Sequence, residues 1–249
     1  MHAVMNEKKE SFLYARIDDA CRALYQPVYF GFFNLAEQAG LENYIRGQRV
    51  AHVFHGGFPD CERKMLCLYP DDVDPDELIW PMGALRFSRD FPMDHRNVLG
   101  TLMSLGVTRE SLGDISLSDN EVQVIFKAHL ASFLEREFVS VKGRTIKPAF
   151  FEYDGIRAYT RAFKEMNITV SSERIDSVIA RIWGLSRQDA ATAIRQGRVR
   201  VNDAEISKLT AKVKPGDIIA LRGKGKAAVD DFDGSTKKNR LRLRVKKYI

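Results

Sequence analysis

Four arginines in the last third of the 249-residue chain, Arg187, Arg195, Arg198 and Arg200, lie within fourteen positions of one another. A guanidinium group binds phosphate oxygens bidentately, and the free N–H groups at the start of a helix also favour anions. These residue types at this spacing therefore indicate a site for phosphate oxygens.

Residues 1–171 contain no nucleophile with a matching base, no matched carboxylate pair and no metal-ligand pattern. His52, His55, Cys61 and Cys67 are the zinc candidates, but they include no compact cysteine pair, and two of them lie in apolar runs typical of strands. We therefore expect no catalytic residue, no metal, no cofactor and no small-molecule substrate.

Two glycine-containing stretches place cations beside a flexible backbone. Gly56-Gly57 precedes Glu62-Arg63-Lys64, whose two cations would either meet a phosphate or lie in a solvated turn. The stretch Arg222-Gly-Lys-Gly-Lys226 lacks the first glycine and the Ser/Thr of a P-loop, so it indicates a mobile basic loop and not a nucleotide site.

Two helices must position the arginines. The first follows Ser171 and Ser172, either of which can cap it, and carries an apolar stripe at helical spacing up to Gly184. Ser186 caps the second, with Asp189 placed as in a capping box but one carbon shorter than Glu. The stripe of the first helix is Ile175, Val178, Ile179 and Ile182, and the buried face of the second is Ala190, Ala193 and Ile194.

Beyond the second helix, Gly197 is expected to adopt a left-handed cap. Residues 198–201 then alternate basic and apolar side chains, as in a strand with one cationic face. Asn202-Asp203 and residues 213–217 read as turns, the second leading into a strand over 218–222. This layout predicts that Arg187 lies beside Arg195, Arg198 and Arg200.

These elements resemble the RNA-binding module first known from small-subunit ribosomal protein S-four, the alpha-L motif. The likeness is carried by Arg174-Ile-Asp176, Ser186-Arg187, Gly197-Arg-Val-Arg-Val-Asn202 and Pro215-Gly-Asp217. The resemblance implies RNA contacts from Arg174, Ser186, Arg187, Arg195, Gln196, Gly197, Arg198, Arg200, Asn202, Lys208, Arg222 and Lys224.

The charge of the chain is unevenly placed. Residues 172–249 carry 19 Lys+Arg and 9 Asp+Glu, whereas residues 1–171 carry 20 and 24. A basic C-terminal part on a mildly acidic body indicates a local contact with a polyanion, the alternative being a solvated lysine-rich tail. Three cysteines without framework spacing and the lack of a long apolar run favour a cytoplasmic protein away from membranes.

The first part of the chain shows a helical pattern over 11–35, limited by Pro27, followed by an aromatic cluster at 30–33 that we expect in a core. Residues 51–69 read as strand, glycine turn, exposed stretch and strand. The acidic loop 71–77 is expected to separate two lobes.

The middle of the chain alternates strands and helices. A strand begins at 85–87, a helix covers 95–106, strands over 114–117 and 121–126 are joined by a turn, and a helix covers 128–138. With strands near 139–141 and 145–151, this order predicts a split alpha/beta sandwich like that of the RNA-recognition motif. At the C-terminus, 227–232 and 241–245 are expected to pair across 233–235, with Arg240, Arg242, Arg244 and Lys246 on one face.

The whole chain also resembles the bacterial YlmH-type RNA-binding proteins. The likeness is carried by Phe33-Asn-Leu-Ala-Glu-Gln38, Gly56-Gly-Phe-Pro-Asp-Cys-Glu-Arg-Lys64, His95-Arg-Asn-Val-Leu-Gly100, Leu105-Gly-Val-Thr-Arg-Glu-Ser-Leu-Gly-Asp-Ile115 and the tail 236–248. The resemblance implies a non-enzymatic protein that binds rRNA and tRNA on the large ribosomal subunit, in the quality control of stalled nascent chains.

We therefore expect an α+β monomer with an α/β lobe over 1–78, a central domain like an RNA-recognition motif over 79–165 and an alpha-L domain with a basic hairpin tail over 172–249. An RNA-modifying enzyme is the first alternative, because this module is appended to pseudouridine synthases and to tyrosyl-tRNA synthetases. However, residues 1–171 contain no motif of either enzyme. A cell-division or structural protein is the second alternative, and it leaves the spaced module unexplained.

Overall fold

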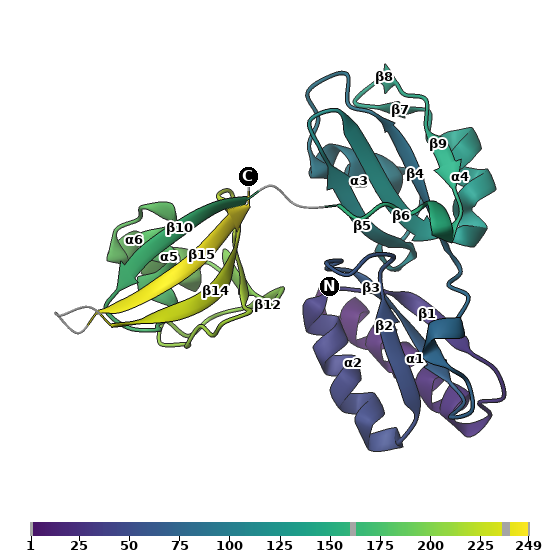
Figure 1. Cartoon of the computed structure of the whole chain (residues 1–249), viewed down its shortest axis with the longest axis horizontal. Helices are drawn as coiled ribbons and strands as arrows, with labels where there is room; N and C mark the ends of the chain where they lie inside the picture. Colours follow the sequence, from purple (N-terminus) through teal and green to yellow (C-terminus); the bar gives the residue numbers. More distant parts are fainter. Residues whose placement is uncertain (1, 160–162, 236–239, 249) are drawn as a thin grey trace. The chain divides into compact units, whose positions relative to one another are not determined.

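The computed structural model describes residues 2–159, 163–235 and 240–248 of the chain. They form two compact units, Met1–Tyr159 and Thr160–Ile249, which we call the N-terminal unit and the C-terminal unit (Figure 1). Both contain helices and sheets, so the α+β class is confirmed. No described helix is long and apolar enough to span a bilayer.

The N-terminal unit begins with a three-stranded antiparallel sheet and two helices. Its strand order is β1-β3-β2, and helix α2 has a capping box formed by Asn34 and Glu37. The strands at 51–55 and 64–69 confirm the predicted pair. The elements are α1 His2–Arg22, β1 Val28–Phe33, α2 Leu35–Gln48, β2 Ala51–His55 and β3 Lys64–Tyr69.

The predicted helical pattern up to residue 35 is wrong beyond Arg22, because Val28–Phe33 is strand β1. A short run of apolar residues fits a buried helix and a buried strand equally well, and pairing with β3 decides for the strand. The expected burial of the aromatic cluster is confirmed, since Phe30, Phe32 and Phe33 are all in the core.

The second part of the N-terminal unit is a four-stranded antiparallel sheet of order β5-β6-β4-β9. Numbered along this part alone, the strands lie in the order 4-1-3-2, so the split alpha/beta topology is as expected. The elements are β4 Met82–Ser88, α3 His95–Ser104, η2 Arg109–Ser111, β5 Leu112–Leu117, β6 Glu121–Lys127, η3 Ala128–Leu130, α4 Ala131–Glu137, β7 Ser140–Val141, β8 Arg144–Thr145, β9 Ala149–Phe151 and η4 Tyr153–Gly155.

The two sheets of the N-terminal unit share a hydrophobic core. Phe32 and Met65 from the first sheet are in the same buried cluster as Met82 and Ile125 from the second. The acidic loop predicted to separate two lobes contains η1 Pro75–Glu77, but Leu78 and Trp80 after it are buried in this common cluster. The sheets are thus parts of one compact unit.

The C-terminal unit is a six-stranded antiparallel sheet of order β10-β15-β14-β13-β11-β12 with two helices. Strand β10 pairs with β15 along its whole length, so the unit includes residues before 172, where we expected the domain to start. The elements are β10 Phe163–Val170, α5 Ile175–Trp183, α6 Arg187–Arg195, β11 Val199–Val201, β12 Ala204–Glu205, β13 Ile218–Leu221, β14 Gly225–Ser235 and β15 Leu241–Tyr248.

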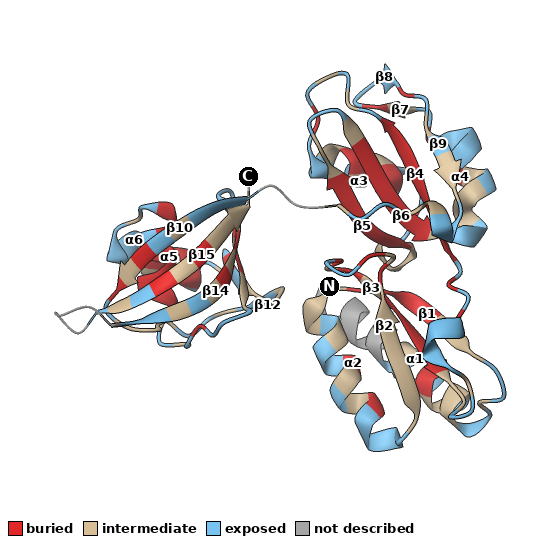
Figure 2. Cartoon of the chain, in the orientation of Figure 1, coloured by how far each residue is buried: buried red, intermediate tan, exposed pale blue. Residues whose placement is uncertain are grey.

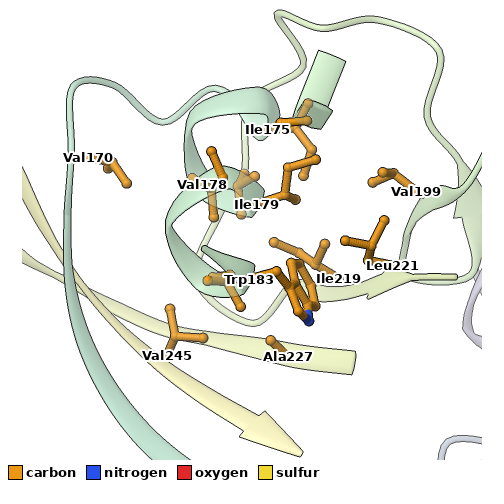
Figure 3. Packing of buried hydrophobic residues seen from close by; sticks show 14 of the residues in the cluster. Val170, Ile175, Val178, Ile179, Trp183, Val199, Ile219, Leu221, Ala227 and Val245 are labelled. Atoms are coloured by element: carbon orange, nitrogen blue, oxygen red, sulfur yellow. The ribbon is translucent and has the colours of Figure 1, made fainter. Parts of the chain in front are cut away.

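The core of the C-terminal unit lies between the helices and one face of its sheet. Figure 3 shows Ile175, Val178 and Trp183 of α5 facing Ile219 and Val245 of the strands. Burying a side chain of this size contributes about 1.5–3 kcal/mol. The sheet face away from the helices is therefore the one on which polar side chains remain in water.

Candidate nucleic-acid interface

Helices α5 and α6 form the scaffold of the predicted site. Ala190, Ala193 and Ile194 of α6 are buried in one cluster with Val178 and Ile182 of α5, as the apolar spacing predicted. Alanine side chains allow the two helices to approach closely. The packing of α6 against α5 therefore fixes the polar face of α6 toward solvent.

The N-terminus of α6 is capped by Ser186 as expected. The Ser186 hydroxyl oxygen accepts a hydrogen bond from the Asp189 N–H at 3.0 Å. The Asp189 carboxylate accepts from the Ser186 hydroxyl at 2.7 Å, and its side chain is one carbon shorter than the Glu of a capping box. Arg187, the first residue of the helix, is exposed and donates from Nη2 to the Ser171 hydroxyl at 2.6 Å.

The prediction that Ser171 or Ser172 caps α5 is wrong. The N-cap residue is Arg174, which makes no side-chain cap, and the Ile175 N–H donates to the Ala211 carbonyl oxygen instead. Arg174 donates from Nε and Nη2 to the two carboxylate oxygens of Asp176, at 3.1 and 2.8 Å. This bidentate bond raises the pKa of Arg174 and compensates its charge within the protein.

The C-terminus of α6 brings a second group of arginines together. Gly197 has φ 63°, as predicted, and the N–H groups of Gly197 and Arg198 donate to Ile194 and Ala193 in a Schellman arrangement. Gln196 is the exposed C-cap residue. The exposed Arg222 is adjacent, because its N–H donates to the Arg198 carbonyl oxygen at 2.8 Å.

The arginines do not converge on one point as predicted. Arg187 and Arg195 stand at opposite ends of α6, about 12 Å apart along its axis at about 1.5 Å per residue. Arg200 alternates with the core residues Val199 and Val201, so it lies on the sheet face away from the helices. The strand alternation correctly predicts that Arg200 faces away from the core. The helices cover the core face of the sheet, so Arg187 of α6 and Arg200 do not lie beside each other.

Two further candidate residues, Asn202 and Lys224, take part in hydrogen bonds that stabilise the fold. Asn202 and Asp203 have φ 49° and 64° and form the turn between β11 and β12. The Asn202 amide donates to Asp217 Oδ1 at 2.9 Å, and its oxygen accepts from the Ile218 N–H at 2.8 Å, so this side chain joins the two predicted turns. Lys224 is exposed, and its carbonyl oxygen accepts from Trp183 Nε1 at 3.0 Å. Lys208 is exposed in the loop after β12.

The C-terminal strands pair as predicted, but β14 continues to Ser235, so residues 233–235, where we expected the turn, are strand. Arg242, Arg244 and Lys246 alternate with core residues and share a face. Lys246 and Arg244 bond to Asp230 at 3.1 and 2.6 Å, which lowers the pKa of that carboxyl. Part of this cationic face is therefore neutralised.

The guanidinium group of Arg63, in the glycine-rich segment of the N-terminal unit, is bound within the protein. Arg63 is buried and donates to the carbonyl oxygens of Phe32, Leu112 and Arg109, contradicting both a phosphate contact and a solvated turn. Gly56 is needed because a Cβ there would stand 2.4 Å from the Cβ of Cys61.

The zinc candidates have other surroundings. His52 Nε2 lies 3.2 Å from a Glu42 carboxylate oxygen, and Cys67 is buried in β3. Cys61 is buried too, and its thiol lies 2.9 Å from the Gly56 carbonyl oxygen. Among the described residues, no group of three or more His, Cys, Asp or Glu is arranged to hold a metal ion.

This geometry suits an extended polyanion better than a small anion. Exposed guanidinium groups stand at both ends of α6 and on the outer sheet face, and within the described residues Arg187, Arg195, Arg198, Arg200 and Arg222 form no ion pair with a carboxylate. A small anion needs groups that converge on it, whereas a nucleic-acid backbone offers phosphates along its length.

Comparisons with known proteins find two RNA-binding domains in the chain. Residues 82–153 match the family model described as "Putative RNA-binding domain in YlmH". Residues 173–219 match the S4 domain, and this range contains all the expected contact residues except Arg222 and Lys224. Over 215 residues the chain is 30% identical to "Ribosome-associated protein quality control protein P2" of Bacillus subtilis (strain 168), covering 85% of this chain and 84% of that protein.

Two further similarities are narrower or more remote. A stretch of 63 residues is 38% identical to "Small ribosomal subunit protein uS4" of Kosmotoga olearia, covering 25% of this chain and 30% of that protein. The solved structure titled "Cell division protein ylmH from Streptococcus pneumoniae" superposes with a TM-score of 0.49 at 15% identity, covering 59% of this chain and 89% of that chain. With its two matched RNA-binding domains and the identity to the Bacillus protein, the chain belongs to the YlmH family of RNA-binding proteins.

Proposed function

We propose that the protein binds the backbone of structured ribosomal and transfer RNA on the large ribosomal subunit, in the cytoplasm, and acts as a monomer in the quality control of stalled nascent chains. One observation carries the proposal. The arginines at the two ends of α6, Arg187 at its start and Arg195 and Arg198 at its end, are exposed and bound to no carboxylate in the part of the chain that the structure describes.

The chemistry of these groups favours backbone contact over sequence readout. Guanidinium groups on a rigid helix bind phosphate oxygens without discriminating between bases. Folded RNA is recognised mostly by shape and by its phosphates and 2′-hydroxyls, because its deep groove is too narrow for side chains. The name of the Bacillus relative, a ribosome-associated quality-control protein, supports the ribosome as the source of that RNA.

The experiment is sedimentation of the tagged full-length chain through a sucrose gradient, followed by sequencing of crosslinked RNA. We expect the protein with the large subunit and crosslinks in ribosomal and transfer RNA. The variant Arg187→Ala/Arg195→Ala/Arg198→Ala is expected at the top of the gradient. Wild-type protein that remains at the top would overturn the proposal.

We propose in addition that the protein catalyses no reaction on the RNA. Residues 1–171 contain no pseudouridine synthase motif with its catalytic aspartate, and no ATP-binding signature of a tyrosyl-tRNA synthetase. Ribosomal RNA incubated with the purified protein is expected to keep its uridines. Pseudouridine formed by the protein alone would contradict this part of the proposal.

A further inference from the structure

The central sheet hides the face that an RNA-recognition motif uses. In that fold, aromatic side chains on the sheet face away from the helices stack on bases. Here Arg86 and Gln123 occupy that face, and both are only 6% exposed. Figure 2 shows β4 and β6 as buried along most of their length.

One cover is the segment after β9, residues 152–159, which we call the strap. Gln123 forms two bonds to the backbone of Arg157: its Nε2 donates to the carbonyl oxygen at 3.0 Å, and its Oε1 accepts from the N–H at 3.1 Å. Arg86 stacks on Phe151, 3.6 Å from the ring centroid, and donates to the Gly155 carbonyl oxygen. The Tyr159 hydroxyl donates to the Leu117 carbonyl oxygen at the far edge.

The other cover is the first sheet of the same unit. Ile125 is fully buried in the cluster that contains Phe32 and Met65. The fit is tight, because a Cβ on Gly113 would lie 3.0 Å from both Ile125 and Phe32. Bases therefore have no surface on this sheet on which to stack.

Exposed cations lie instead at the β7–β8 hairpin. Lys142 and Gly143 have φ 53° and 71°, so they form a tight turn that projects Lys142 and Arg144 into solvent. Lys142 Nζ lies 3.5 Å from the Pro92 carbonyl oxygen, and the Arg144 guanidinium lies 5.2 Å from the centroid of the Phe91 ring. The hairpin is thus held against the loop that leads into α3.

Two more exposed cations accompany the hairpin. Lys147 follows it, and Arg96 is in the first turn of α3, whose contact with β7 is direct. None of Arg96, Lys142, Arg144 and Lys147 forms an ion pair within the described residues. Of the two carboxylates in the loop before α3, Asp94 already accepts the Asn97 N–H as helix cap, and Asp90 is exposed.

We propose that the central domain binds RNA through this hairpin surface, formed by Arg96, Lys142, Arg144 and Lys147, by contact with backbone phosphates and not by base stacking on its sheet. The surrounding residues 1–171 are acidic overall, so a local cationic surface there is not a consequence of composition. An arginine stacked on an aromatic ring keeps its donor edge available for a phosphate. The inference rests on the proposed function and names a second contact for the same RNA.

The test compares two doubly substituted full-length chains. Lys142→Ala/Arg144→Ala removes two cations of the surface, and Arg22→Ala/Arg46→Ala removes two cations that have carboxylate neighbours at 3.2 and 3.8 Å. We expect the first pair to reduce the log–log salt slope for a ribosomal RNA fragment by about 1.4 to 1.8, at about 0.7 to 0.9 per phosphate contact, and the second pair to leave it unchanged.

A charge-retaining variant separates charge from packing. Lys142→Arg/Arg144→Lys is expected to restore the slope, and failure to restore it in a chain with wild-type thermal unfolding would overturn the inference. Equal salt slopes for the two alanine pairs would also overturn the inference. A variant that binds ribosomal particles more weakly but free RNA as well as wild type would overturn it too, because that result would identify a protein partner.

The outcome for the proposed function is read separately. If Arg187→Ala/Arg195→Ala/Arg198→Ala loses binding while the hairpin variant behaves like its control, the hairpin inference fails and the proposed function stands. If neither variant changes RNA binding, both fail.

Discussion

The Arg187 guanidinium donates to the hydroxyl oxygen of Ser171 at 2.6 Å, and the same hydroxyl lies 3.1 Å from that of Ser177. The partner of Arg187 is thus neutral, whereas Arg174 is bound bidentately by the Asp176 carboxylate. A phosphate that approaches Arg187 displaces a hydroxyl, but at Arg174 it must compete with an anion. We therefore expect the arginines of this module to be unequal ligands for RNA.

We expect Arg187→Ala to weaken binding of a structured ribosomal RNA fragment about 10- to 100-fold, because a hydrogen bond between charged groups contributes about 1.5–3 kcal/mol. Arg187→Lys should fall between wild type and Arg187→Ala, since it keeps the charge but loses the planar fork. Fluorescence anisotropy titration measures both. Lys212→Ala is the control, because it removes one charge that lies 3.3 Å from Glu173; equal affinities of Arg187→Ala and wild type would contradict the assignment.

Arg63→Met is expected to destabilise the N-terminal unit by at least about 3 kcal/mol, because it removes three hydrogen bonds from a buried charged donor, and such bonds contribute about 1.5–3 kcal/mol each. The carbonyl oxygens concerned are those of Phe32, Arg109 and Leu112. Urea denaturation measures the loss, with Lys64→Met at the half-buried neighbouring position as control. A variant of normal stability but with a smaller salt slope of RNA binding would instead make Arg63 a phosphate ligand.

We expect the stability of the N-terminal unit to depend on pH through His55. Burial, and secondarily the charge of Lys64, lowers its pKa, and the Tyr153 hydroxyl lies 2.7 Å from its Nε2. Because the folded chain binds the proton less tightly than the unfolded chain, this contribution is fully present above about pH 6.5 and is lost as the pH falls through the folded pKa. Urea denaturation at about pH 7.5 and about pH 5.5 should show a smaller difference for His55→Gln than for wild type. An unchanged difference would show that His55 does not titrate in this way.

The local features of the RNA-binding module were predictable from the sequence. Ser186 and Gly197 are where a helix cap and a left-handed turn are required, and the alternation around Arg200 identified its strand. The separation of Arg187 from Arg200 was not predictable in this way, because spacing gives the face of each element but not which face a neighbouring element covers. The YlmH family assignment from the quoted motifs is confirmed by the family models and by the Bacillus relative.

Other features depend on residues far apart in the chain. Arg63 is buried only because its acceptors come from residues 32, 109 and 112, and no local pattern announces this. The cations of the β7–β8 hairpin were overlooked in the sequence analysis, although a glycine between two cations, Lys142-Gly-Arg144, is a recognisable turn signal. The sequence does not show that the outer face of the central sheet is covered. This cover makes the hairpin a better candidate for RNA contact than the sheet.

The most direct test of RNA binding by the C-terminal unit is the dependence of RNA affinity on salt concentration. Four to six neutralised phosphates predict a log–log slope of about −3 to −5 for the full-length chain. In Arg187→Ala/Arg195→Ala/Arg198→Ala the slope should become shallower by about 2 to 3. It should not change in Lys212→Ala/Arg244→Ala/Lys246→Ala, which removes the same charge from residues already paired with Glu173 and Asp230. Binding by the first triple variant at wild-type affinity and with the wild-type slope would contradict the account.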